Sequence, residues 1–177
     1  MPRFAVSVLG LDRPGIVAAV TRVLADAGCN LEDASMTILR GHFAMMLLVS
    51  GPDHATQELI ETVLDPVGDG LDLQLGVRPV TDTVTTAEPA GERYVLSVYG
   101  SDRPGLVARV TEVLAARRIN IVDLQARVIG EPEPVYAMHY ELEVPAGALD
   151  GLDDELRQVE RELDVRASLQ PDEADVL

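Results

Sequence analysis

A nine-residue segment that occurs twice constrains the fold of this chain more than any other feature of its sequence. The segment Gly10–Ala18 reads GLDRPGIVA and recurs 90 positions later as GSDRPGLVA, Gly100–Ala108. Phe43 recurs as Tyr136, 93 positions later, so the second copy has about three extra residues, which we place in Gly130–Pro134. Two copies of one unit predict two similar domains, because stacked repeat folds need at least three copies.

Each copy fills a domain-sized stretch, and the segment between the copies has the composition of a linker. We expect the first domain over residues 1–80 and the second over residues 93–170. Residues 81–92 are rich in Thr, Ala, Pro and Gly and have no apolar period, which is typical of a linker. Residues 171–177 form an acidic tail, which we expect to fray.

The apolar patterns follow the same order in both copies and predict the elements β-α-β-β-α-β. β-branched and aromatic residues predict first strands over 4–9 and 94–99, and apolar residues at helical spacing follow each of them. A hairpin, a second helix and a last strand complete each copy. They cover 31–39 with 43–50, 59–64 and 72–80 in the first copy, and 121–129 with 135–144, 149–163 and 164–169 in the second. The order predicts an α+β ferredoxin-like fold, a four-stranded antiparallel sheet with helices on one face.

Composition argues against several classes of partner. The formal net charge is -16, and the densest basic spot is Arg117-Arg118, so the surface should repel nucleic acid and acidic membranes. Aromatic residues make up 3% of the chain and Trp is absent, which disfavours stacking on single-stranded bases. We therefore expect no direct nucleic-acid partner and no membrane partner.

The sequence is also that of a cytoplasmic protein. Its single cysteine, Cys29, cannot form an intrachain disulfide, which fits a reducing compartment. The first residues do not have the pattern of a signal peptide. The longest apolar run, Phe43–Val49, is too short to span a bilayer.

Residues that carry catalysis or bind metals are few and scattered. The three histidines, His42, His54 and His139, have no Cys or carboxylate at a metal-ligand spacing. Cys29 has no His nearby in the sequence, so we interpret it as a packed small side chain rather than a nucleophile. No phosphate loop or dinucleotide fingerprint is present. We expect no catalytic residue, no metal and no cofactor.

The repeated turn between the first strand and the first helix can bind an anion. Asp12 and Asp102 can cap the helix start, and Gly15 and Gly105 lack a Cβ where a ligand or another backbone could approach. The amides that follow are unpaired donors at the positive end of the helix dipole, a site that suits the carboxylate of an amino acid. The same residues also make an ordinary strand-to-helix turn, so the motif alone leaves binding open.

The segment from Gly10 to Asn30 resembles the ACT-domain family, with a short apolar strand, Asp-Arg-Pro-Gly-Ile-Val, an amphipathic helix and Cys-Asn-Leu. The second copy matches through Asp102–Val107 and Ile119–Ile121. ACT domains are ferredoxin-like modules that pair and bind amino acids at their shared interface. The resemblance therefore implies a homodimer formed through ACT domains, with an amino-acid effector. It implies sites at Asp12, Gly15, Ile16, Asn30 and Leu31, and at Asp102, Gly105, Leu106, Asn120 and Ile121.

An asparagine amide both donates and accepts hydrogen bonds. We therefore expect Asn30 or Asn120, from the same or a neighbouring domain, to close each site on the ammonium or carboxylate of the ligand.

A chain that consists of two such domains resembles, more narrowly, the glycine cleavage system transcriptional repressors. The segments Gly28–Ser35 and Phe43–Gly51 carry this resemblance. That resemblance implies a non-catalytic amino-acid sensor that acts through a protein partner in the control of glycine and one-carbon metabolism. The first copy also resembles the N-terminal domain of formyltetrahydrofolate deformylase. A regulatory subunit or module of such an amino-acid-metabolism enzyme is therefore the alternative, and a scaffold that only drives oligomerisation is a third hypothesis.

Overall fold

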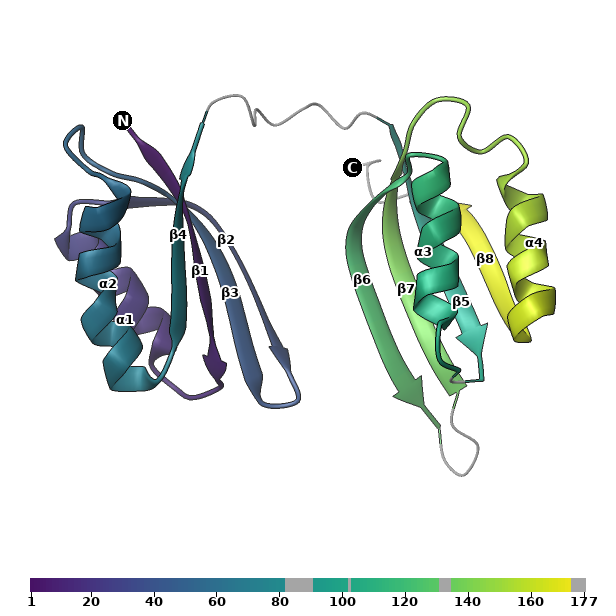
Figure 1. Cartoon of the computed structure of the whole chain (residues 1–177), viewed down its shortest axis with the longest axis horizontal. Helices are drawn as coiled ribbons and strands as arrows, with labels where there is room; N and C mark the ends of the chain where they lie inside the picture. Colours follow the sequence, from purple (N-terminus) through teal and green to yellow (C-terminus); the bar gives the residue numbers. More distant parts are fainter. Residues whose placement is uncertain (82–90, 102, 131–134, 173–177) are drawn as a thin grey trace. The chain divides into compact units, whose positions relative to one another are not determined.

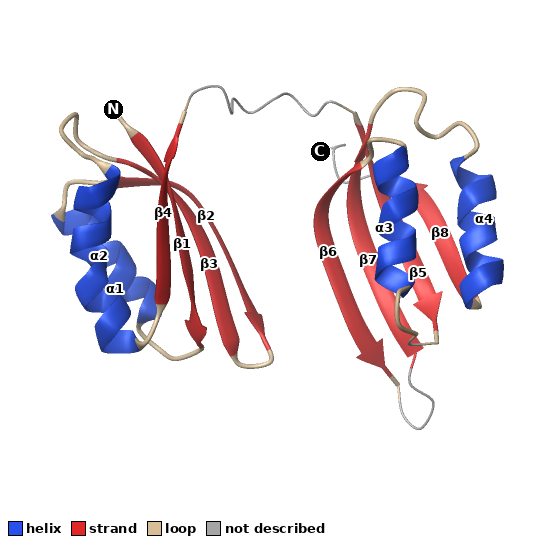
Figure 2. Ribbon diagram, viewed as in Figure 1, coloured by secondary structure: helices blue, strands red, loops and turns tan. Residues whose placement is uncertain are grey.

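The computed structural model describes residues 1–81, 91–101, 103–130 and 135–172. The chain divides into two compact units, Met1–Thr85 and Thr86–Leu177, which we call unit 1 and unit 2 and describe separately (Figures 1 and 2). Most of the expected linker, the expected insertion in the second copy and the expected acidic tail lie outside the described residues.

Both units have the same elements in the same order. Unit 1 contains β1 (Arg3–Leu11), α1 (Ile16–Asp26), β2 (Asn30–Leu39), β3 (His42–Ser50), α2 (Gln57–Leu71) and β4 (Gln74–Val80). Unit 2 contains β5 (Glu92–Gly100), α3 (Leu106–Ala116), β6 (Asn120–Ile129), β7 (Val135–Val144), α4 (Leu152–Leu163) and β8 (Val165–Pro171). The sheets are antiparallel, with strand orders β2-β3-β1-β4 and β6-β7-β5-β8. The prediction of two ferredoxin-like units is confirmed.

Buried and more exposed residues alternate along the central strands, and the buried ones form the face of each sheet that two helices cover. In β1, Phe4, Val6 and Val8 are buried, while the residues between them lie on the other face. The core of unit 1 contains Phe4 and Phe43 as its aromatic residues. The core of unit 2 contains Tyr140, whose side chain is fully buried, with Tyr94 and Tyr136 packed against the same cluster.

The first helix of each unit ends in the same backbone motif, with different residues at its left-handed position. Gly28 has φ 76°, and its N–H donates to the Ala25 carbonyl at 2.9 Å. In unit 2, Arg118 has φ 58°, and its N–H donates to the Ala115 carbonyl at 3.0 Å. A residue with a Cβ loses roughly 1–2 kcal/mol in this conformation. Unit 2 therefore carries a local strain that glycine removes from unit 1.

Replacing Arg118 by glycine should stabilise unit 2 by about 0.5–1 kcal/mol, because the relief of strain exceeds the backbone freedom gained by the unfolded chain. The matched variant Gly28→Ala introduces the strain into unit 1 and should destabilise it by about 1 kcal/mol. Urea unfolding of both variants measures these changes. A less stable Arg118→Gly protein would contradict the assignment of strain to this residue.

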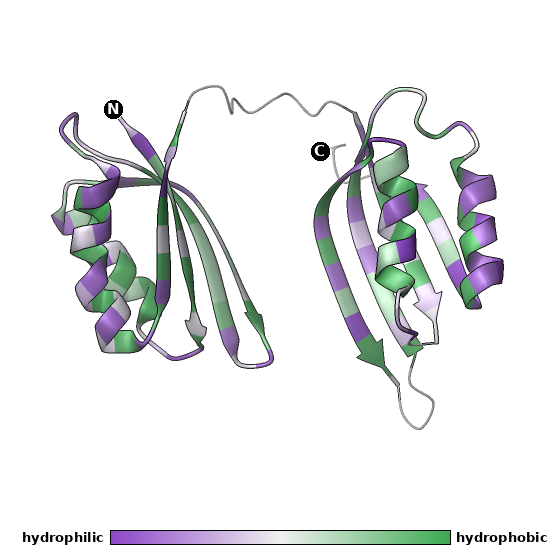
Figure 3. Cartoon of the chain, viewed as in Figure 1, coloured by the Kyte–Doolittle hydropathy of each residue, from purple (hydrophilic) through white to green (hydrophobic). Residues whose placement is uncertain are grey.

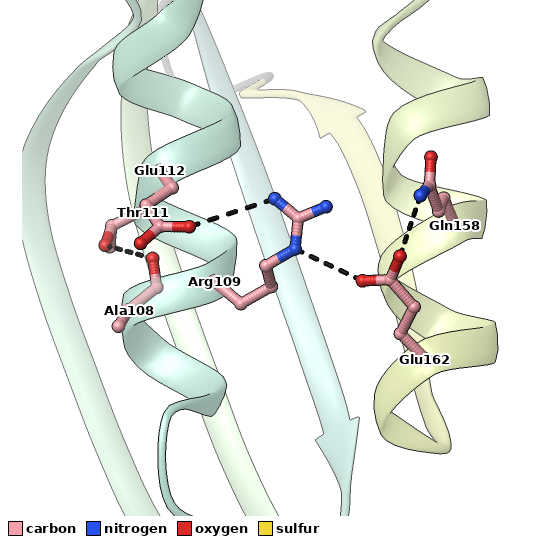
Figure 4. Close-up of polar contacts among 6 residues, drawn as sticks. All are labelled: Ala108, Arg109, Thr111, Glu112, Gln158 and Glu162. Carbon is pink, nitrogen blue, oxygen red and sulfur yellow. Dashed lines mark hydrogen bonds and ion pairs between the residues drawn. The ribbon is translucent and has the colours of Figure 1, made fainter.

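Charged side chains join the two helices of unit 2. Arg109 Nε donates to Glu162 Oε2 at 3.2 Å, and Gln158 Nε2 donates to Oε1 of the same carboxylate at 2.7 Å (Figure 4). Arg117 donates to both carboxylate oxygens of Glu155, at 3.1 and 2.9 Å, and to two backbone carbonyls ahead of α4. These hydrogen bonds hold the pKa of the Glu155 carboxyl below its usual range. Arg117 thus attaches the loop before α4 to the end of α3.

Candidate functional site

The repeated turn places a left-handed glycine immediately before each first helix. Gly15 is the N-cap of α1 with φ 98°, and Gly105 is the N-cap of α3 with φ 88°. A Cβ added to either glycine would meet no described atom within 4 Å. These glycines are required by the backbone conformation. The expected close approach of a second backbone segment is not found there among the described residues.

The close approach occurs at the first glycine of the repeated motif, Gly10 in unit 1 and Gly100 in unit 2. A Cβ at Gly10 would lie 2.5 Å from the Leu73 side chain. A Cβ at Gly100 would lie 2.9 Å from both the Asp164 carbonyl oxygen and Val165 Cα. These glycines let the end of the first strand lie against the start of the last one, directly before the turn. The repeat of the glycine was visible in the sequence, but its packing partner was not.

Asp12 does not cap α1, which corrects the expectation from the sequence. No side-chain hydrogen bond caps this helix within the described part of the chain. The backbone N–H of Asp12 donates instead to the Gly41 carbonyl at 2.8 Å and joins the turn to the β2–β3 hairpin. Asp102 lies outside the described residues, so its expected role stays a prediction.

Each helix start offers backbone amides rather than side chains. The side chains of Ile16 and Leu106 are 1% exposed and belong to the two cores. The first hydrogen bond of α1 runs from the Ala19 N–H to the Gly15 carbonyl. The backbone N–H groups of residues 16–18 therefore have no partner within the helix. In unit 2, the Leu106 N–H donates to the Arg103 carbonyl at 3.3 Å. The start of α1 is therefore the more available anion site.

The asparagines expected to complete these sites lie at the other end of each first helix. Asn30 and Asn120 begin β2 and β6, after α1 and α3 have ended (Figure 1). The 11 residues of α1 span about 16 Å, so Asn30 and Gly15 of one unit cannot contact the same small amino acid. The expectation that one domain supplies both is wrong. An asparagine supplied by a neighbouring domain stays a prediction.

Asn30 instead lines a groove of unit 1 between α1 and the start of β2, with a volume of about 440 Å³. Arg22 and Asn30 supply the guanidinium and amide groups that suit a carboxylate. Burial raises the pKa of the Cys29 thiol, which therefore lines the groove as a neutral, weakly polar group. The other lining residues are Ala18, Thr21, Leu24, Ala25, Leu31 and Val49.

Sequence reasoning found Asn30 and Leu31 but missed the helix wall of this groove. Ala18, Arg22 and Ala25 recur at the spacing of one helix face, a signal that was present in the sequence. The corresponding region of unit 2 differs. Ile119 stands in the place of Cys29 and is buried in the core, Ile121 packs partly against that core, and Asn120 is exposed.

Titratable side chains do not gather into a catalytic or metal-binding cluster where the structure describes them. Among those residues, no group of three or more His, Cys, Asp or Glu could hold a metal ion. Ser97 Oγ and His139 Nδ1 lie 3.5 Å apart on neighbouring strands, at the limit of a hydrogen bond. No helix in the described ranges is long and apolar enough to cross a membrane.

Comparison with known proteins identifies relatives of both units. A model of the ACT domain family matches residues 3–78, and a second one matches residues 94–161. The chain is 35% identical over 122 residues to the glycine cleavage system transcriptional repressor of Escherichia coli strain K12, and the match covers 69% of this chain and 63% of that relative.

Two solved structures resemble the whole chain. The crystal structure of an unknown protein from Galdieria sulphuraria has a TM-score of 0.82 and 30% identity, and the match covers 97% of this chain and 98% of that one. A structure provisionally assigned as a glycine cleavage system transcriptional repressor has a TM-score of 0.71 and 27% identity, with 96% of each chain covered.

Proposed function

Because this chain belongs to the ACT-domain family, with one ACT domain in each unit, we propose that it is a non-catalytic regulator that senses an amino acid. The observation that carries the proposal is the duplicated, glycine-capped helix start in a chain 35% identical to a transcriptional repressor. The name of that relative directs the proposal to the control of glycine metabolism. We extend the proposal to one-carbon metabolism in the cytoplasm, and the net charge of -16 favours action through a protein partner rather than on DNA. The ACT domains of two chains pair to form a homodimer.

The proposed effector is bound by its carboxylate. The unpaired amides at the start of α1, beside Gly15, receive the negative charge at the positive end of the helix dipole. The start of α3, beside Gly105, is the second and less available site, because the Leu106 N–H already donates to the Arg103 carbonyl. Asn30 or Asn120 of a neighbouring domain closes the site, because the asparagine of the same unit is too far away. Leu31 and Ile121 follow these asparagines and contribute apolar contact.

A small effector sets an upper limit on affinity. Glycine has about five non-hydrogen atoms, and the best tiny ligands gain roughly 1.5 kcal/mol for each, which gives at most about 7.5 kcal/mol. This corresponds to a dissociation constant of a few micromolar at best, because about 8.2 kcal/mol corresponds to 1 μM. Values from tens of micromolar to millimolar are expected, a range that matches metabolite pools.

Asn30→Ala and Asn120→Ala should each weaken amino-acid binding by about 1–3 kcal/mol, because a polar group of the complex loses its partner. Isothermal titration calorimetry of the full chain with single amino acids measures the change. Gln125→Ala, which alters an exposed amide within β6, is the matched control. Gly15→Val is not a clean probe, because its φ of 98° would strain any β-branched residue.

The calorimetric results distinguish an error in the proposed function from an error in the proposed binding site. If no amino acid binds the parent chain, the sensing function is wrong. If one binds the parent and both asparagine variants equally, the sensing function stands and this location is wrong.

The chain alone should not bind DNA with sequence specificity. Its formal net charge is -16, and contacts with DNA phosphates require clustered Lys or Arg. An electrophoretic gel-shift experiment at low salt, where electrostatic binding is strongest, tests this expectation. A retarded band at nanomolar protein would contradict the proposed action through a protein partner.

A further inference from the structure

The sheets of the two units differ on the face that their own helices leave uncovered, which we call the open face. In unit 1 the central strands β1 and β3 present small and apolar residues there. Leu9 is 47% exposed and Met46 is 55% exposed. The central residues of this open face are Ala5, Ser7, Leu9, Ala44, Met46 and Leu48.

The open face of unit 2 carries charge at the matching places. Ser97 lies opposite His139 just as Ser7 lies opposite Met46, and Val95 lies opposite Glu141. Arg127 and Arg166 stand on the outer strands of the same face. Figure 3 shows that β6 and β7 carry more hydrophilic residues along their length than β3, which is mostly pale or green. One fold thus presents a solvent-compatible face in unit 2 and an apolar face in unit 1.

The open face of unit 1 is also hollowed at one end. A cavity of about 490 Å³ lies where β1 ends beside the β2–β3 hairpin. Leu9, Leu11 and Leu39 line it, with His42, Asp72 and Gln74 also in its wall, and Leu11 and Leu39 are 53% and 68% exposed. Contiguous exposed apolar side chains of this kind mark a surface that another protein covers.

Two opposite charges stand at the two edges of this face in one row across the sheet, while Arg3 and His42 lie at the ends of its central strands. Leu48 on β3 is the register partner of both Ala5 on β1 and Asp33 on β2. Ala5 is also the partner of Arg78 on β4. The strand order β2-β3-β1-β4 therefore gives the row Asp33, Leu48, Ala5, Arg78, with opposite charges at its ends. Asp33 and Arg78 are both exposed.

We propose that the open face of unit 1 packs against the same face of a second copy of this chain, about a two-fold axis parallel to the strands. Such an axis places β2 of one copy over β4 of the other. It does not shift residues along the strands, so each row of one copy faces the same row of the other. Asp33 of each copy then faces Arg78 of the other, so one pair of residues forms two complementary contacts, as isologous symmetry requires. The uncharged centre lets two acidic chains meet without direct repulsion.

The area is sufficient for a specific but modest interface. Strands β1 and β3 have nine residues each, so the face is roughly 30 Å long, and four strands make it about 19 Å wide. Two such faces bury about 1,100 Å², just above the roughly 1,000 Å² that a specific interface needs. This inference rests on the pairing of ACT domains in the proposed function and names its surface. The axis keeps Asn30 at the Arg3 end of the strands and Gly15 at the Leu11 end, so the asparagine that closes the site at Gly15 does not come from the paired unit 1.

Sedimentation equilibrium of the full chain, from about 1 to about 100 μM, tests the proposal. Met46→Lys should raise the dissociation constant of the dimer at least about tenfold, because it places an unpaired charge within the apolar contact. His139→Lys, at the matching position of unit 2, should leave it unchanged. Met46 is half-exposed in one chain, so circular dichroism should show the variant folded.

Charge reversal tests the direction of the axis. Asp33→Arg or Arg78→Asp alone should weaken the dimer, and the double variant should restore it. A monomeric parent chain would overturn the proposal and leave this face to a different protein. A dimer that His139→Lys weakens and Met46→Lys does not, or a double variant without recovery, would also overturn it. Neither result bears on amino-acid binding measured by calorimetry.

Discussion

Gly100→Ala is expected to destabilise unit 2 by about 3 kcal/mol, at the upper end of the usual penalty for overpacking. The added Cβ would lie 2.5 Å from Val165 Cγ1 and 2.9 Å from both the Asp164 carbonyl oxygen and Val165 Cα. The last two are backbone atoms at the start of β8, which cannot move aside singly. Urea unfolding gives the loss of stability, and hydrogen exchange of the strand amides assigns it to unit 2.

Two glycines of the same motif serve as controls for this prediction. Gly10→Ala should be milder, about 1 kcal/mol, because the nearest atom at 2.5 Å is the flexible end of the Leu73 side chain. Gly105→Ala meets open space and should lose only the roughly 1–2 kcal/mol of a left-handed backbone. Equal effects of Gly100→Ala and Gly10→Ala would contradict the close backbone packing of the second unit.

Tyr140→Phe is expected to protect unit 2 from unfolding at alkaline pH. Burial raises the pKa of the Tyr140 phenol from 10.0 to about 12, with a smaller contribution from Tyr136. Below about pH 10 the phenol is protonated in both folded and unfolded chains, and its contribution to stability is fully present. Between pH 10 and 12 only the unfolded chain releases the proton, so stability falls by about 1.4 kcal/mol per pH unit, about 2.7 kcal/mol in all.

The chain is well suited to this measurement, because all 14 of its basic residues are arginine and it contains no lysine. Unfolding free energies of the parent and Tyr140→Phe should therefore diverge as the pH rises from 10 to 12. Tyr99→Phe is the control, since Tyr99 is 46% exposed and its phenol is in contact with water. If Tyr140→Phe and the parent lose stability in parallel, burial of this phenol does not govern the alkaline transition.

The sequence predicts the fold well because alternation and helical spacing depend only on which residues are buried. Val6, Val8, Val20 and Leu24 are buried as their patterns require. The strand 135–144 has the bounds expected for it. The second helix of unit 1 does not, because α2 continues to Leu71, beyond Leu64, the last apolar residue of the predicted helix face. Two copies with one pattern also made the two-unit architecture evident.

The site was harder to predict, because it depends on distances and backbone angles that no residue pattern contains. Gly15 was correctly identified as special, but its role is a left-handed φ rather than close packing, which belongs to Gly10. Asn30 is close to the turn in the sequence and distant in space, because α1 runs the length of the unit between them. The apolar open face around Met46 required the strand register as well as the alternation.

The division of aromatic residues between the two cores makes the units optically distinct. All four tyrosines, at 94, 99, 136 and 140, belong to unit 2, both phenylalanines, at 4 and 43, belong to unit 1, and Trp is absent. Tyrosine fluorescence and the absorption band of tyrosine therefore report the state of unit 2 alone, while far-ultraviolet dichroism reports both units. Melting the intact chain under the two signals separates the unfolding of one domain from the other without a label, a mutation or a cut in the chain.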